Sequence, residues 1–266
     1  MKALPGDAHI GEVTLAVANL DRSLAFYTDV VGLVILWQDS GVAALGAAEG
    51  RPSLVRLQEQ VGAVARPRGS SGLYHIAIRV PSRAALGRSL RRLAERRWPL
   101  TGASDHLVSE ALYLDDPDGL GLEVYRDRPR EHWRVSDGEV EMATEPLDLD
   151  SVAAERGAGG AWSGVEPETN IGHVHLHVPD LGSAEALYCG ALGFTPTLRR
   201  YPGALFVAAG GYHHHVGLNV WAGPGAPPPP PAAVGLRAFT VEAKTLDSRT
   251  VVDAATEVAI TVRPVA

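Results

Sequence analysis

Three side chains in the first half of the chain are of types that bind a divalent metal ion. Glu12, His75 and Glu123 each lie where apolar residues alternate with other residues, a pattern typical of a β-strand with one buried face. If the apolar residues face the core, these three side chains share the opposite, concave face of a sheet. One imidazole and two carboxylates suit Fe(II), Mn(II), Ni(II) or Zn(II) and leave coordination positions free for substrate oxygens. Taken singly, each residue also fits an ordinary polar position.

The second half carries a separate cluster of histidines. Strand alternation places two groups of them on shared faces, and the members are His173, His175, His177, His213 and His215. Neutral imidazoles bind borderline divalent metals, so His173 with His213 or His215 is a second candidate metal site, without a carboxylate. The alternative is a buried polar pocket in which the imidazoles bond one another and water. On this pattern His214 points to the core or to the sheet edge.

His106 and Tyr125 are the candidates for moving protons beside the first site. His106 precedes a predicted strand near the proposed cup, and an imidazole acts as a general acid or base near neutral pH. Tyr125 is a nearby tyrosine that can do the same. The plainer interpretation is a turn capped by Asp105, followed by a surface histidine. The sequence contains no nucleophile elbow, phosphate-binding loop or dinucleotide fingerprint.

The elements that must position these residues repeat along the chain. Residues 10–33 align without gaps on residues 171–194, which indicates an internal duplication. Each copy begins as an alternating strand and continues into a helix, with Asn19 or Asp21 as the cap in the first copy. Short strands separated by Gly and Pro follow. The pattern predicts a βαβββ module.

Four such modules account for most of the chain. The second begins with the strand at residues 72–80 and has Ser82 as its helix cap, and the fourth is shortened because only 33 residues remain from Val234. We therefore predict an α+β protein in which paired βαβββ modules form two cupped mixed-sheet domains. The predicted boundaries are a first domain at 1–130, a connector at 131–168, and a second domain at 169–266 with a truncated last module.

Composition excludes several classes of protein. The 266 residues are 45% hydrophobic and 21% charged, and no apolar run approaches the roughly 20 residues of a membrane helix. The net charge of −7 provides no basic field for nucleic acid. We expect neither a nucleic acid nor a membrane as partner, and we leave a homodimer open. A single cysteine, Cys189, and a polar start without a signal-peptide core indicate the cytoplasm.

The motifs together resemble the vicinal oxygen chelate superfamily, which contains glyoxalase I, bleomycin resistance proteins and extradiol dioxygenases. The resemblance is carried by IGEVTLAVANLDRSLAFYTDVVGL, GLYHIAIRV and YLDDPDGLGLEVYRDRP. More narrowly, GASDHLVSEALYLDDPDG and GGYHHHVGLNVWAG resemble two-domain bacterial proteins described as catechol-2,3-dioxygenase-like. The resemblance implies metal ligands from the first strand of one module and from the first and last strands of the next.

Carried onto this sequence, those positions are Glu12, His75 and Glu123. Extradiol enzymes carry His, His and Glu there, so Glu12 departs from the pattern. In the second domain the corresponding later positions fall on Ala238 and Ile260, which leaves His173 without its partners.

The resemblance implies a metal-dependent extradiol ring-cleavage dioxygenase acting on a small catechol-like molecule with vicinal oxygens. Fe(II) is the favoured metal, with Mn(II), Ni(II) or Zn(II) as alternatives, and His106 or Tyr125 would move protons. Two other functions fit the same family. One is a glyoxalase-type metal-dependent isomerase or lyase, and the other is a drug-binding or metabolite-binding protein without catalysis, like the bleomycin resistance proteins.

Overall fold

The computed structural model describes residues 3–265, and its elements follow the four predicted modules. The first contains β1 (His9–Val17), α1 (Leu20–Ala25) with a π-helical turn (Phe26–Val31), β2 (Val34–Asp39), β3 (Val42–Gly46) and β4 (Ser53–Glu59). The second contains β5 (Gly72–Arg79), α2 (Arg83–Arg96), β6 (Gly102–Asp105), β7 (Ser109–Asp115) and β8 (Gly121–Asp127). Asn19 and Ser82 cap the two helices.

A connector and two further modules complete the chain. The connector contains a 3-10 turn (Arg130–His132), β9 (Val135–Ser136), β10 (Glu139–Val140), β11 (Glu145–Pro146) and α3 (Leu149–Ala153). The third module contains β12 (Asn170–His177), α4 (Leu181–Glu185) with a π-helical turn (Ala186–Ala191), β13 (Thr195–Leu198), β14 (Ala204–Ala208) and β15 (Val216–Asn219). The fourth contains β16 (Gly235–Ala243), β17 (Arg249–Asp253) and β18 (Val258–Pro264), with no helix among them. The α+β class and the shortened fourth module are confirmed.

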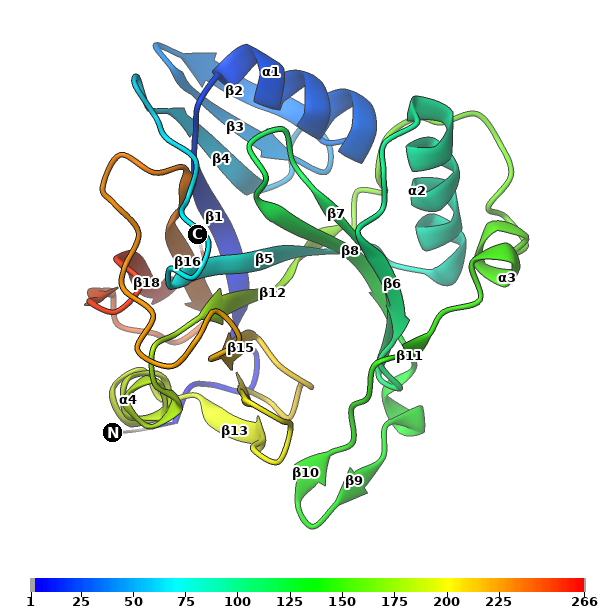
Figure 1. Cartoon of the computed structure of the whole chain (residues 1–266). Helices are drawn as coiled ribbons and strands as arrows, with labels where there is room; N and C mark the ends of the chain where they lie inside the picture. Colours follow the sequence, from blue (N-terminus) through cyan, green and yellow to red (C-terminus); the bar gives the residue numbers. More distant parts are fainter. Residues whose placement is uncertain (1–2, 266) are drawn as a thin grey trace.

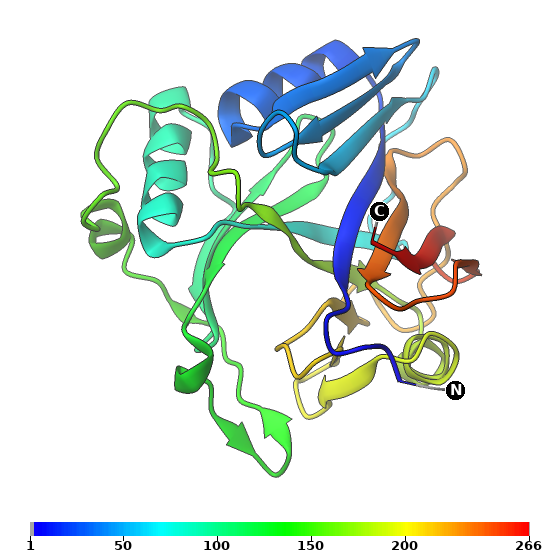
Figure 2. The same cartoon turned by 180° about the vertical axis from the view of Figure 1, so that it is seen from behind.

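The strands form two large curled sheets and one small ribbon. The order of the larger sheet is β11-β6-β7-β8-β5-β12-β15-β14-β13, and that of the second is β17-β18-β16-β1-β4-β3-β2. The ribbon pairs β9 with β10. Figure 1 shows the long strands β5 and β12 running side by side, and Figure 2 shows β1 beside β16.

The pairing of modules differs from the one we expected. Instead of the first with the second, the second module pairs with the third through antiparallel β5 and β12, and the first pairs with the fourth through β1 and β16. Alternation predicts which face of a strand is buried but not which strand lies beside it. The boundaries at residues 130 and 168 stay a prediction.

One hydrophobic core joins the two sheets. Ile10 and Val13 of β1 belong to the same buried cluster as Ile76 of β5 and Val174 of β12. Helix α1 lies against β4, α2 against β8, and α4 against β14 and β15, so the helices leave the opposite sheet faces free. Among residues 3–265, no helix has both the length and the apolar character needed to cross a bilayer.

Candidate metal centre

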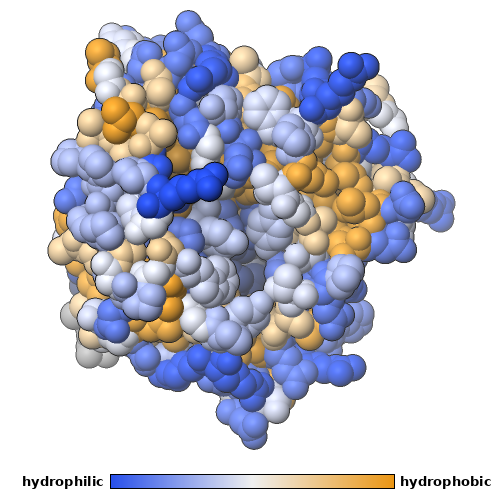
Figure 3. Space-filling model, in the orientation of Figure 1, coloured by the Kyte–Doolittle hydropathy of each residue, from blue (hydrophilic) through white to orange (hydrophobic). Residues whose placement is uncertain are grey.

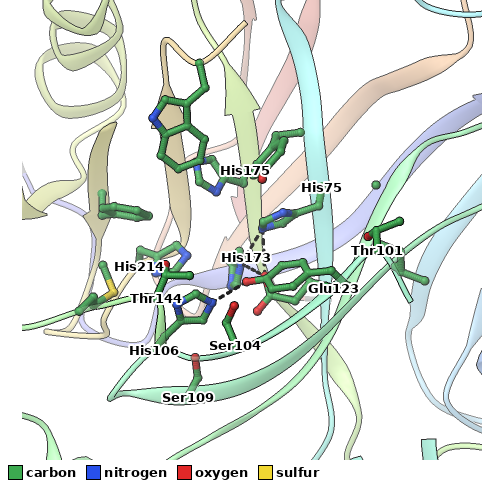
Figure 4. A pocket seen from close by; sticks show the side chains of 18 of the residues that line it. His75, Thr101, Ser104, His106, Ser109, Glu123, Thr144, His173, His175 and His214 are labelled. Carbon is green, nitrogen blue, oxygen red and sulfur yellow. Dashed lines mark hydrogen bonds and ion pairs between the residues drawn. The ribbon is translucent and has the colours of Figure 1, made fainter. Parts of the chain in front are cut away.

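Three buried side chains from neighbouring strands converge in the larger sheet. His75 Nε2 lies 3.0 Å from Glu123 Oε2, His173 Nε2 lies 3.1 Å from the same oxygen, and the two Nε2 atoms are 3.3 Å apart. All three residues are 5% exposed or less. Figure 4 shows the three side chains pointing toward one another from β5, β8 and β12.

Strand register brings these side chains together. Ala77 of β5 pairs with Glu123 of β8 on one side and with His173 of β12 on the other. Directly paired residues point to the same face of a sheet, and so do residues two apart along one strand. Glu123, His173 and His75 therefore share the face of Ala77, whose small side chain leaves space between them.

The electrostatics of the cluster suit a cation. Burial alone would raise the pKa of the Glu123 carboxyl, but His173 and His75 hold that pKa well below its ordinary value. Burial lowers the pKa of His173 to about 4. Near neutral pH an ionised carboxylate therefore faces a neutral imidazole, and buried His173 Nδ1 has no hydrogen-bond partner. Two imidazole nitrogens and one carboxylate oxygen that face a common point fit a divalent metal ion.

A cavity of about 470 Å³ opens beside the cluster. Its lining includes the hydroxyl-bearing residues Thr101, Ser104, Ser109, Tyr113 and Thr144, and the aromatic residues Tyr74, Tyr201, Phe206 and Trp221. Figure 3 shows that one face of the molecule is hollowed near its centre. The cluster thus lies where a small molecule can reach it.

His106 and Tyr113 form a hydrogen-bonded pair in the cavity lining. The carbonyl oxygen of Ala143 can only accept a hydrogen bond, so His106 Nδ1 donates to it over 2.6 Å. In the neutral ring Nε2 then accepts from the Tyr113 hydroxyl, also over 2.6 Å. Tyr113 lies opposite Glu123 in the β7–β8 pair, and burial together with Glu123 raises its pKa well above the ordinary value.

Comparison with known proteins agrees with this geometry. Residues 9–124 and 170–263 match the model of the Glyoxalase/Bleomycin resistance protein/Dioxygenase superfamily. The chain belongs to this superfamily. Over 245 residues it is 46% identical to a Bacillus subtilis (strain 168) protein named catechol-2,3-dioxygenase, an alignment that covers 91% of this chain and 85% of that protein.

Two solved structures share the fold. A putative dioxygenase from Bacillus subtilis superposes with a TM-score of 0.64 at 16% identity, covering 99% of this chain and 86% of that one. Glyoxalase I from Zea mays has a TM-score of 0.57 at 15% identity, covering 96% and 92%. The family resemblance predicted from the motifs is confirmed.

Glu12 does not join the cluster, and the prediction that it lies with His75 and Glu123 is corrected. It lies on β1 in the other sheet, where its Oε1 accepts from Arg56 Nε over 2.8 Å. Strand β1 is flanked by β4 and β16 and has no edge free to pair with β5 or β8. His173 lies beside His75 and Glu123 instead, so the cluster contains two histidines and one glutamate, the composition that the resemblance to extradiol enzymes implied.

The other histidines of the second half do not form a metal site of their own. His213 Nε2 donates to Asp127 over 3.0 Å, and His215 Nδ1 accepts from the Ala209 amide over 3.1 Å. Within residues 3–265, His75, Glu123 and His173 are the only group of three or more potential ligands.

His214 is buried but lines the cavity, contrary to its expected position. Its ring lies 4.1 Å from that of His173, and its Nδ1 lies 2.7 Å from His213 Nδ1. The histidine triplet precedes β15 in a segment without strand geometry, so period-two alternation does not apply to it. In the neutral form, donation from His213 to Asp127 leaves His213 Nδ1 to accept from His214.

Tyr125 lies next to His173 but does not line the cavity. Its hydroxyl lies 2.7 Å from that of Tyr212, and its ring lies 5.0 Å from the His173 ring. A Cβ atom on Gly172 would fall 1.7 Å from the Tyr125 oxygen, so the glycine leaves space for this ring. Of the tyrosines that line the cavity, Tyr113 lies opposite Glu123, and it could not be predicted because its place depends on the β7–β8 register.

Proposed function

We propose that this protein is a metal-dependent extradiol dioxygenase that opens the ring of a catechol-like molecule beside its two hydroxyl groups. The observation that carries the proposal is the buried set of His75, Glu123 and His173 next to a cavity. Two histidines and one carboxylate are the ligand set of many non-haem Fe(II) oxygenases, so we favour Fe(II). The relative named catechol-2,3-dioxygenase supports the same substrate class.

A bound Fe(II) ion would supply Lewis acidity toward adjacent substrate oxygens and redox chemistry with dioxygen. The residues of this chain would bind and orient the diol and exclude water from it. The Tyr113 hydroxyl and His106 Nε2 form a short path along which a substrate proton can leave the cavity. Tyr125, which does not reach the cavity, would instead hold the His173 ring in place.

The first experiment measures metal content. We expect purified protein, reconstituted under argon with Fe(II), to bind one ion per chain. His173→Ala and Glu123→Ala should lose this ion, because each removes one of three ligands. Glu12→Gln is the matched control, since it changes a carboxylate in the other sheet. Loss of metal in Glu12→Gln, or full retention in the two alanine variants, would contradict the proposed ligand set.

The second experiment measures turnover. Exposure of the Fe(II)-loaded protein to air and catechol should consume one dioxygen per ring and produce a yellow ring-opened product. Full metal loading without turnover of any diol would count against the dioxygenase. Turnover of a vicinal-oxygen substrate under argon, with Ni(II) or Mn(II), would favour the isomerase or lyase. Stoichiometric ligand binding that a chelator does not change would favour a binding protein.

A further inference from the structure

The cavity is larger than a single catechol ring requires. Its volume of about 470 Å³ lies in the range of roughly 300–1,000 Å³ that is typical of pockets enclosing drug-sized ligands. One six-membered ring held at the cluster would leave much of this volume unfilled. The lining beyond the cluster therefore determines which substituent the ring can carry.

Aromatic rings extend outward from the ligand His75. Its ring centroid lies 5.0 Å from that of His175, which lies 5.4 Å from that of Trp221. Tyr74 lies edge-on to both, 5.0 Å from His175 and 5.5 Å from Trp221. We call Tyr74, His175 and Trp221 the aromatic wall. Tyr74 and Trp221 are 40% and 45% exposed, so part of their surface is available to stack on a ligand.

Apart from a metal ion at the cluster, the cavity lining, which lies wholly within residues 3–265, supplies no lysine or arginine to pair with an anionic substituent. Its acidic members are Glu123 and Asp115. Arg200 lies in an adjoining hollow, where it contacts Asp137 and Glu139 at 3.5 Å each. When the two hydroxyl groups occupy the cluster, a carboxylate on the substituent points away from the metal ion and would lose its water without a neighbouring lysine or arginine, which is costly.

We propose that the site selects uncharged catechols with an aromatic or other apolar substituent, which packs against the aromatic wall, and discriminates against catechols that bear a carboxylate. The inference rests on the proposed function, because the substituent reaches the wall only when the two hydroxyl groups lie at the cluster. It adds to the proposed function the kind of substituent that the substrate carries and the charge of the substrate.

Binding under argon tests the inference without turnover. The Fe(II)-loaded protein is titrated calorimetrically with catechol, with 3-phenylcatechol and 4-phenylcatechol, and with 3,4-dihydroxybenzoate. We expect one phenylcatechol to bind at least about tenfold more tightly than catechol, and the benzoate to bind most weakly. Benzoate binding at least as tight as catechol, or phenylcatechols no tighter than catechol, would overturn the inference. If the affinities follow the expected order but the protein does not open the ring in air, the dioxygenase proposal is wrong, whereas the inference about substrate selection still holds.

Substitutions in the wall make the test specific. Trp221→Leu should lower the ratio of phenylcatechol to catechol affinity by roughly three- to tenfold, as expected for a lost aromatic contact. Tyr74→Leu is a second wall variant if the first does not fold. The matched control is Trp37→Leu, since Trp37 is 42% exposed on β2 of the other sheet. If Trp221→Leu and Trp37→Leu change the affinity ratio equally, the aromatic wall does not bind the substituent.

A charge reversal tests the other half of the inference. Asp115→Lys replaces a lining carboxylate with an ammonium group and should tighten binding of 3,4-dihydroxybenzoate by roughly tenfold, without a matching gain for catechol. High salt should reduce this gain if it is electrostatic. Equal gains for the charged and the uncharged ligand would contradict charge selection by the cavity.

Discussion

Tyr113 is the residue through which the proposed function connects the candidate metal centre to proton transfer. Its hydroxyl donates to His106 Nε2, and its strand position is opposite Glu123. A positioned acid or base contributes roughly 10²–10⁴-fold to a rate. We therefore expect Tyr113→Phe to lower kcat for ring cleavage by about 100-fold or more while one Fe(II) per chain remains bound.

Tyr125→Phe is the matched control for this variant. It also removes one buried hydroxyl, but one that bonds Tyr212 behind His173 and does not line the cavity. We expect its effect on kcat to be much smaller, as measured by stopped-flow absorbance of the product. A larger loss in Tyr125→Phe than in Tyr113→Phe would return Tyr125 to the catalytic role that the sequence suggested.

At the scale of elements, corresponding aspartates of two modules hold a buried tyrosine in the same way. Asp116, in the turn between β7 and β8, accepts from the Leu120 and Asp118 amides and from the Tyr27 hydroxyl at 3.3 Å. The end of β17 repeats the contact, since Asp253, its last residue, accepts from the Tyr188 hydroxyl at 3.2 Å. The duplicated modules therefore also share a hydrogen bond between a buried tyrosine and an aspartate of the next module.

The turn at Asp116 makes stability depend on pH. Burial raises the pKa of this carboxyl from 3.8 to about 6, so folding favours the protonated form. The stabilisation is complete below pH 4 and is lost as the pH rises through about 6. Asp116→Asn keeps a neutral oxygen for the two amides. Relative to this variant, the wild type should lose roughly 2.5 kcal/mol of unfolding free energy between pH 4 and 8.

Urea unfolding of both proteins at pH 4 and pH 8 measures this difference, because contributions from all other groups cancel in the comparison. Parallel pH dependence in the wild type and in Asp116→Asn would show that the carboxyl titrates normally in the folded protein. The tyrosine contact itself is tested by Tyr27→Phe, which should leave most of the pH effect, since burial is its main cause.

At the level of the whole chain, the candidate metal centre joins two modules that the connector separates in sequence. His75 and Glu123 come from the second module and His173 from the third. An ion that binds only the folded chain stabilises it by about 3 kcal/mol at a free concentration of roughly 100 times Kd. We expect Fe(II) under argon to raise Tm by roughly 5–10 °C relative to chelator-treated protein.

Differential scanning calorimetry with and without metal measures the shift. Glu123→Ala should abolish it, whereas Glu12→Gln should retain it because Glu12 is paired with Arg56 in the other sheet. The reverse result would place the ion in the sheet that contains β1 and not in the one that contains β5.

The modules, the helix caps of the first two and the buried faces of the alternating strands could be predicted from the sequence, because alternation and capping depend on residues within a few positions of one another. His75 and Glu123 were predicted to lie in one candidate metal site, whereas His173 was predicted for a second, separate site. The three-dimensional fold was needed to show that His173, and not Glu12, lies with His75 and Glu123, and that Tyr113 and His214 line the cavity. Which strands pair depends on packing between residues far apart in the sequence. β5 pairs with β12 and β1 with β16, and the alternation within a strand does not specify its neighbour.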